Sequence, residues 1–173
     1  MDQARRIRLA GDDWGASRFL TGEPMCERLQ AKCEELGVEF VRHSDSRLAT
    51  FVGWFAEHFG RWEDWRARFW FTLGRRIFHP DHIQDPIGKF QTLVAHELVH
   101  VEQQSKTLLW WWVARYLTSW RFRWRMEREA YLENIRSGDP ALRVSKRLQT
   151  AYGIKLSTVE MVRWFADHLE VYA

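Results

Sequence analysis

The chain has 173 residues, of which 46% are hydrophobic and 28% are charged. This composition excludes a disordered or fibrous chain and suits one domain with a buried core. The net charge of +3 does not by itself indicate a nucleic-acid partner. We therefore expect a single domain over residues 1–173, with residues 1–22 as an arm or loop because they contain three glycines and no clear period.

Targeting segments are not evident in the sequence. The first residues carry basic side chains but lack the apolar run of a secretory signal. The most apolar stretch, residues 108–114, ends at Arg115 and falls short of the ~20 residues that a transmembrane helix needs. The sequence thus predicts a cytoplasmic protein. Cys26 and Cys33 lie two turns apart on one expected helix, so we interpret them as packed free thiols.

The hydrophobic periodicity and the turn residues predict an α+β protein that is mostly helical. In chain order we expect a helix over 24–36, a short strand over 38–41, a helix over 47–59, a β-hairpin over 69–78, and helices over 86–104, 107–119, 124–136, 140–150 and 157–170. Residues 61–68 fit either a short helix or an inserted loop. Asp85 before Pro86, and Ser157 three residues before Glu160, are typical helix starts.

The helix over 86–104 carries the most specific pattern in the chain, HELVH at residues 96–100. Two histidines four residues apart lie about 40° apart around a helix axis, so His96 and His100 can reach one metal ion. Glu97 is rotated by about 100° from His96 and can lie beside that ion. The spacing suits peptide hydrolysis, because zinc lowers the pKa of a bound water and a carboxylate can take its proton. The alternative is two core histidines that hydrogen-bond to their neighbours.

A catalytic zinc ion needs a third protein ligand and an open position. A histidine at the spacing of the extended motif is absent, because Lys106 stands there. The helix over 124–136 offers Glu127 on a largely apolar stripe, whereas Glu129 and Glu133 fall on a polar side where they can stay solvated. Because a buried carboxylate requires a cation, Glu127 is the favoured ligand and Glu129 is the alternative.

The segment HELVHVEQQ, followed by E-x-x-A-Y at residues 127–131, resembles the gluzincin branch of zinc metallopeptidases. The likeness is closest to the small single-domain minigluzincins and to uncharacterised bacterial or phage proteins with HELxHVxQ, and it spans about residues 69–135. It implies a zincin-like fold with a hairpin before the active-site helix, and one zinc ion. The implied ligands are His96, His100 and Glu127, and the implied catalytic base is Glu97.

The resemblance also suggests a role for Tyr131. This residue stands where many members have an aspartate that orients a ligand histidine, so its hydroxyl is one candidate for that task. A partner for the oxyanion of the transition state is expected as well, with Tyr131, Tyr116, His79 and His82 as candidates. His79 and His82 also form a weak candidate for a second metal site.

The hairpin has an expected role in substrate binding. Zincin-type peptidases resemble one another in offering an exposed strand edge to the substrate backbone, and the strand over 76–79 is the candidate here. The alternative is a hairpin that only covers the core.

Residues 108–125 mix tryptophan with arginine and allow three interpretations. The first is a helix buried against the helix over 86–104 and followed by a surface turn. The second is a segment that lies in the interface of a membrane. The third, least favoured, is a contact with nucleic acid.

Taken together, these patterns predict a zinc metalloendopeptidase that acts on a peptide or protein substrate, with a latent form as a further possibility. The alternative is a non-catalytic, zinc-stabilised module that binds a protein partner or a membrane surface through residues 108–125.

Overall fold

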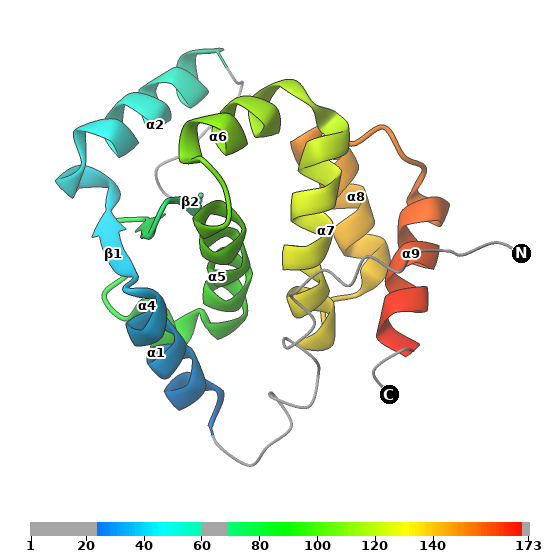
Figure 1. Cartoon of the computed structure of the whole chain (residues 1–173), viewed down its shortest axis with the longest axis horizontal. Helices are drawn as coiled ribbons and strands as arrows, with labels where there is room; N and C mark the ends of the chain where they lie inside the picture. Colours follow the sequence, from blue (N-terminus) through cyan, green and yellow to red (C-terminus); the bar gives the residue numbers. More distant parts are fainter. Residues whose placement is uncertain (1–23, 60–68, 171–173) are drawn as a thin grey trace, which may run out of the picture.

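A computed structural model describes residues 24–59 and 69–170 of the chain. Helices dominate these residues, and three short strands form one mixed sheet, so the predicted α+β class is confirmed (Figure 1). The expected arm over residues 1–22 and the ambiguous segment 61–68 lie outside the described residues.

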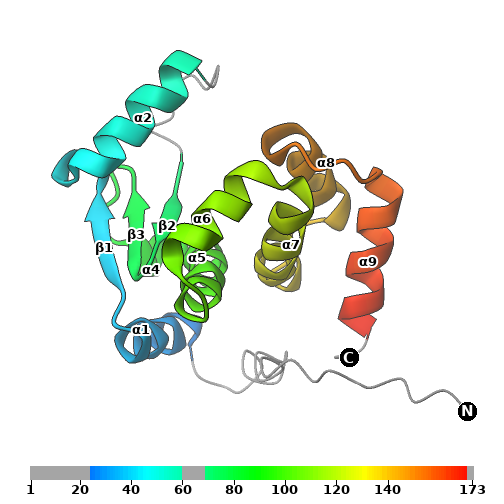
Figure 2. The same cartoon turned by 45° about the horizontal axis from the view of Figure 1, so that its top comes forward.

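The order of helices and strands follows the prediction closely. The elements are α1 Met25–Leu36, β1 Glu39–Arg42, the 3-10 helix η3 His43–Asp45, α2 Arg47–Phe59, β2 Phe71–Leu73, β3 Arg76–His79, α4 Pro86–Lys89, α5 Gln91–Ser105, α6 Leu109–Thr118, α7 Trp120–Arg136, α8 Ala141–Tyr152 and α9 Thr158–Glu170. The sheet lies on one side of α5, and α7, α8 and α9 lie on the other (Figures 1 and 2).

Several helix termini match the local signals in the sequence. α1 ends at Leu36 and is followed by Gly37, whose φ of 63° is a left-handed conformation that glycine adopts without strain. Asp85 caps α4, because its Oδ1 accepts a hydrogen bond from the backbone N of Gly88 at 2.8 Å. At the start of α9, Ser157 N donates to Glu160 Oε2 at 2.8 Å and Glu160 N donates to Ser157 Oγ at 3.2 Å, which is the expected capping box.

Two helix boundaries differ from the prediction. The helix expected over 86–104 is interrupted at Phe90, which has φ −128° and ψ 39°, so α4 and α5 are separate helices. α7 begins at Trp120, four residues earlier than expected, because Ser119 Oγ accepts a hydrogen bond from Phe122 N at 3.3 Å. The start of α7 is marked by this serine cap, which lies within an aromatic and basic segment and is not visible in the hydrophobic periodicity.

The sheet has the order β1-β3-β2, with β1 parallel and β2 antiparallel to β3. The hairpin itself is confirmed, and its turn contains Gly74 with φ 62°. The expectation that the strand over 76–79 offers a free edge is wrong, because β3 is paired on both sides. The hairpin pattern could not reveal this, since the partner on the second side is a strand from before α2.

Gln104 of α5 fixes the hairpin in place. Its side chain is buried; its Oε1 accepts a hydrogen bond from Gly74 N at 2.6 Å and its Nε2 donates to Thr72 O at 3.0 Å. Thr72 pairs with Ile77, one residue beyond the pair that closes the turn, so its carbonyl points away from β3. One acceptor on the outer edge of β2 is therefore occupied by a side chain of α5.

Two hydrophobic clusters lie on opposite sides of the α5–α7 contact. The first joins α1, β3 and α5 and includes Leu29, Ile77, Val94, Leu98 and Val101. The second joins α7, α8 and α9 and includes Leu132, Val144, Leu148, Met161 and Phe165. Between these clusters, the facing sides of α5 and α7 bury polar and charged residues, so polar contacts join the two halves.

Cys26 and Cys33 are free, as predicted. Burial, assisted by the charge of Glu34, raises the pKa of the Cys33 thiol to about 11, so this thiol stays protonated at neutral pH. Across residues 24–59 and 69–170, none of the helices has the length and the apolar character needed to cross a bilayer.

Replacing Gln104 with alanine tests the anchoring of the hairpin. We expect the Gln104→Ala variant to lose about 1–3 kcal/mol in the free energy of unfolding, because two hydrogen bonds to the hairpin backbone disappear. Urea denaturation followed by circular dichroism measures this. The control is Gln30→Ala on the exposed side of α1, which should change stability by less than about 0.5 kcal/mol. Equal stability of the two variants would show that Gln104 does not anchor the hairpin.

Candidate metal centre

The facing sides of α5 and α7 bring together His96, His100 and Glu127, the three residues predicted as metal ligands. One nitrogen or oxygen atom from each lies within 4.8 Å of the other two, and all three side chains are buried. Among the described residues this is the one group of three histidine, cysteine or acidic side chains with such spacing. The group can therefore bind a metal ion.

The distances within the group leave room for an ion. Nε2 of His96 lies 3.6 Å from Oε2 of Glu127, and Nε2 of His100 lies 3.4 Å from Oε1. Both separations exceed the about 2.7–2.9 Å of a charge-assisted hydrogen bond. Oε2 of Glu127 is buried without a hydrogen-bond partner, and the side chain is only 1% exposed. An ion between the three residues would satisfy this oxygen.

Both imidazoles are oriented with Nε2 toward the centre of the group. Nδ1 of His96 lies 2.9 Å from Oδ1 of Asn134, and Nδ1 of His100 lies 2.9 Å from Oε1 of Gln103. Because the amide oxygens only accept hydrogen bonds, each Nδ1 carries a proton, and Nε2 is the atom of each ring that can bind an ion. Gln103 is itself held, since its Nε2 donates to the carbonyl of Met126 at 3.0 Å.

α6 closes the side of the group formed by His100 and Glu127. The hydroxyl of Tyr116 donates a hydrogen bond to Oε1 of Glu127. Trp112 stacks on Tyr116 with ring centres 4.8 Å apart and meets the ring of His100 edge-on at 6.0 Å. Burial and the charge of Glu127 raise the pKa of Tyr116 well above its usual value, so its phenol remains a donor at neutral pH.

The electrostatics of the group favour a cation. Burial alone would lower the pKa of His100, but the nearby charge of Glu127, together with the charge of Glu97, raises it to about 9. Burial alone would raise the pKa of Glu127, yet the nearby imidazoles of His100 and His96 hold it well below its usual range. A buried, ionised carboxylate that attracts a proton onto His100 also attracts a divalent ion.

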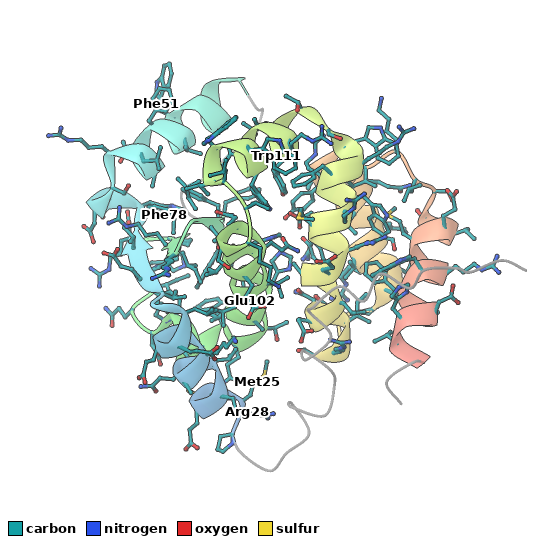
Figure 3. All side chains as sticks on the ribbon, viewed as in Figure 1. Met25, Arg28, Phe51, Phe78, Glu102 and Trp111 are labelled. Atoms are coloured by element: carbon teal, nitrogen blue, oxygen red, sulfur yellow. The ribbon has the colours of Figure 1, made fainter. Side chains whose placement is uncertain are left out.

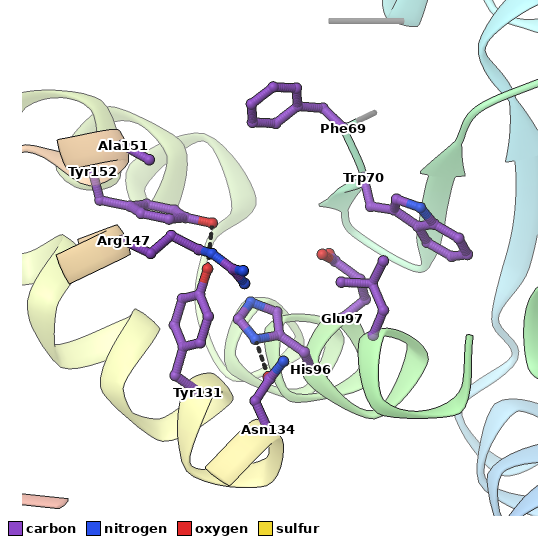
Figure 4. A pocket seen from close by; sticks show the side chains of 10 residues that line it. Phe69, Trp70, His96, Glu97, Tyr131, Asn134, Arg147, Ala151 and Tyr152 are labelled. Carbon is purple, nitrogen blue, oxygen red and sulfur yellow. Dashed lines mark hydrogen bonds between the residues drawn. The ribbon is translucent and has the colours of Figure 1, made fainter. Parts of the chain in front are cut away.

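Glu97 lies beside the group without joining it. Its carboxylate is buried, and its Oε2 accepts a hydrogen bond from the hydroxyl of Thr72 at 2.7 Å. Together with His96, it lines a cavity of about 670 Å³ (Figure 4). The remaining lining residues are Phe69, Trp70, Leu93, Tyr131, Asn134, Arg147, Ala151 and Tyr152.

The cavity has two chemically different walls. Figure 4 shows Phe69 and Trp70 on the β2 side, facing Tyr131, Arg147 and Tyr152 from α7 and α8. The Tyr131 hydroxyl donates to the Tyr152 hydroxyl at 3.3 Å. An apolar aromatic wall thus stands opposite a wall of hydroxyl groups and one guanidinium.

Tyr131 does not orient His96 through its hydroxyl, which was one candidate role. Its ring instead packs edge-on against His96 with ring centres 4.5 Å apart, and Asn134 makes the hydrogen bond to Nδ1. Of the other oxyanion candidates, Tyr116 is engaged with Glu127, and neither His79 nor His82 lines the cavity.

The remaining sequence candidates lie apart from the group. His79 Nδ1 is 3.0 Å from the carbonyl of Pro80, and it belongs to no metal-ligand group among the described residues. Glu129 is exposed, as expected. The expectation that Glu133 stays solvated is wrong: its side chain is buried, and Arg136, one turn later, donates to its Oε1 at 2.5 Å. Burial raises the pKa of Glu133.

Three supporting residues were not identified from the sequence. Asn134 lies seven residues after Glu127, two helical turns along the same side of α7, and this spacing was an available signal. Gln103 lies three residues after His100 and has the same kind of signal. Thr72 had none, because its contact with Glu97 joins a strand to a helix 25 residues later.

The comparisons with known proteins give one partial match. A family model described as the eCIS core domain matches residues 67–108. The segment includes β2, β3, α4 and α5 with both histidines and Glu97, and it ends before Glu127. No curated protein and no solved structure matches the chain. The chain is therefore similar to that domain over less than half of its length.

Replacing Glu127 with glutamine tests the metal ligands. We expect the wild-type protein to hold one divalent ion per chain and the Glu127→Gln variant to bind it more than about 100-fold more weakly, because the negative ligand is lost. Elemental analysis after dialysis and a competitive chelator titration measure this. The control is Glu129→Gln, which changes an exposed glutamate of the same helix and keeps an acceptor for Gln103. Equal affinity of the two variants would exclude Glu127 as a ligand.

Asn134 is expected to act by positioning His96. Asn134→Ala should lower metal affinity by about 10–100-fold, because His96 loses the acceptor that fixes its ring. Asn134→Asp keeps an acceptor oxygen and should retain an affinity close to that of the wild-type protein. The same chelator titration separates the two variants. If both bind the ion as the wild type does, the hydrogen bond has no role in metal binding.

Proposed function

We propose that the protein is a zinc-dependent metallopeptidase that hydrolyses peptide bonds in a peptide or protein substrate. One observation carries the proposal: a carboxylate that is not part of the ligand group, Glu97, lies beside that group and lines a cavity large enough for part of a peptide. A purely structural metal site needs four protein ligands and no neighbouring base.

The choice of zinc rests on the ligand atoms. Two imidazole nitrogens and one carboxylate oxygen suit zinc, whereas magnesium and calcium prefer oxygen ligands alone. Zinc bonds of about 2.0–2.1 Å at tetrahedral angles place neighbouring ligand atoms about 3.3 Å apart. The separations of 3.6 Å from His96 and 3.4 Å from His100 to Glu127 are close to this value. Three protein ligands leave one position open.

Bound zinc would supply a Lewis acid that lowers the pKa of water to about 7. Glu97 then acts as general base: Thr72 holds its Oε2, and the carboxylate takes a proton from the attacking water and passes it to the leaving amine. Tyr131 and Tyr152 present hydroxyl groups in the same cavity. We assign Tyr131 as the donor that stabilises the oxyanion, with its hydroxyl proton turned from Tyr152 to the substrate.

The partial match supports the same location for the chemistry. The matched segment, residues 67–108, contains Glu97 and both histidine ligands together with the strand that holds Glu97. The name of the matched domain refers to extracellular contractile injection systems. We include in the proposal that this chain is related to proteins of such injection systems.

The alternative function is a metal-stabilised binding module without catalysis. The apolar residues that α6 exposes favour it, because they offer a surface for a partner. The two functions differ in what they require of Glu97, which a binding module does not need.

Replacing Glu97 with glutamine separates the two. In the peptidase, Glu97→Gln keeps the fold and the ion but lowers the cleavage rate by about 10²–10⁴-fold, because no carboxylate takes the proton. Mass spectrometry of a diverse peptide library and elemental analysis give the two readouts. The control is Glu35→Gln on the exposed side of α1, which should cleave at the wild-type rate. Cleavage by Glu97→Gln at that rate, or no cleavage by a wild-type protein that holds its ion, would contradict the peptidase.

A further inference from the structure

α6 has two faces with different surroundings. Trp112 and Tyr116 point inward to the metal centre, as described above. On the opposite side Trp110 is 69% exposed and Leu117 is 70% exposed, and Leu108, the residue before α6, is 67% exposed. The interpretation of residues 108–125 as a buried helix therefore holds for one face of α6 only.

α2 extends this exposed surface. Its Leu48, Phe51 and Trp54 are exposed at helical spacing, and the rings of Phe51 and Trp54 stack at 6.2 Å. A cavity of about 340 Å³ reaches both helices: Leu48 of α2 and Leu109 of α6 line it, and its other lining residues belong to the sheet, the hairpin turn and Gly37. Figure 3 shows Phe51 projecting outward from α2. We name this surface the α2–α6 face; its members are Leu48, Phe51, Trp54, Leu108, Leu109, Trp110, Trp111 and Leu117.

The charge around the α2–α6 face has one sign along α6 and the start of α7. No aspartate or glutamate occurs between Glu102 and Glu127, and the basic residues there are Lys106, Arg115, Arg121, Arg123 and Arg125. The whole chain has a net charge of only +3, so this segment concentrates positive charge. Arg115 lies 5.3 Å from the ring centre of Trp111, which places a cation beside an exposed indole.

We propose that the α2–α6 face docks on the surface of an anionic lipid bilayer. α6 lies in the plane of the interface, and its exposed tryptophans and leucines enter the boundary between headgroups and acyl chains. Arg115, Arg121, Arg125 and Lys106 contact lipid phosphates, whereas Arg123 is held by backbone carbonyls of the fold. With ten residues, α6 is far too short to span the bilayer. The apolar side chains supply the insertion and the basic ones supply the preference for anionic lipid.

Two other occupants fit the face less well. A nucleic acid would use the arginines and the indoles, but exposed leucines such as Leu108 and Leu117 add nothing to phosphate contacts or base stacking. A second copy of the chain would bring two basic surfaces together in a symmetric interface, and like charges oppose such an association. Anionic lipid uses both the apolar and the basic groups.

Docking of this face is compatible with the proposed chemistry but does not depend on it. No residue of the α2–α6 face lines the larger cavity beside Glu97, so a docked molecule keeps that cavity free for substrate. The lipid proposal can therefore fail or succeed independently of the peptidase.

Sedimentation of the full chain with lipid vesicles tests the proposal. We expect binding to vesicles of phosphatidylcholine mixed with phosphatidylglycerol, weak binding to phosphatidylcholine alone, and a loss of affinity at high salt. The double variant Trp110→Ala, Leu117→Ala should bind about tenfold more weakly or worse, because two inserted side chains are removed. The control is Leu142→Ala, Val159→Ala, which removes apolar residues that are 53% and 77% exposed on α8 and α9; it should bind as the wild type does.

Circular dichroism shows whether the first double variant keeps its fold. If it does not, a second double variant tests the same proposal. Arg121→Gln, Arg125→Gln changes only exposed charges and should also weaken binding to the anionic vesicles. The proposal is overturned if the wild type does not bind these vesicles, or if the control loses as much affinity as the first double variant. Light scattering that shows a dimer dissociated by Trp110→Ala, Leu117→Ala, or tight binding to single-stranded DNA without vesicle binding, also overturns it.

Discussion

The structure depends on one buried negative charge. Glu127 lies in the polar layer between two hydrophobic clusters, where an unpaired carboxylate would be strongly destabilising. His96 and His100 from α5 and Tyr116 from α6 surround it. These contacts require α5, α6 and α7 to meet in one register, so the constraint that positions the ligands also sets how the two halves of the molecule pack. The polar layer therefore contains the candidate metal centre.

A second set of polar contacts connects the sheet to this layer. Thr72 holds the carboxylate of Glu97 with its hydroxyl, and Gln104 holds the backbone of the same strand. The hairpin therefore contributes to the position of the proposed base as well as to the core. α6 likewise contributes on both sides: on its inner side Tyr116 donates a hydrogen bond to Glu127, and on its outer side exposed apolar residues form part of the α2–α6 face.

Local signals predicted much of this structure. The two histidines and Glu97 share one turn of a buried helix, and Glu127 was identified because an acidic residue on an apolar stripe needs a cation. Contacts between distant segments were not predictable from such signals: β1 adds to the far side of β3, and Asn134 takes the place expected for Tyr131 beside His96. Glu133 was misjudged because the side of α7 that looks polar in the sequence is partly covered and paired with Arg136.

The central claim is that an ion sits between α5 and α7, and anomalous diffraction at the zinc absorption edge tests it most directly. Crystals of the protein should show one peak about 2.0–2.2 Å from Nε2 of His96, from Nε2 of His100 and from a carboxylate oxygen of Glu127. A zinc-loaded crystal without a peak at that position, or with Glu127 turned toward solvent, would contradict the account.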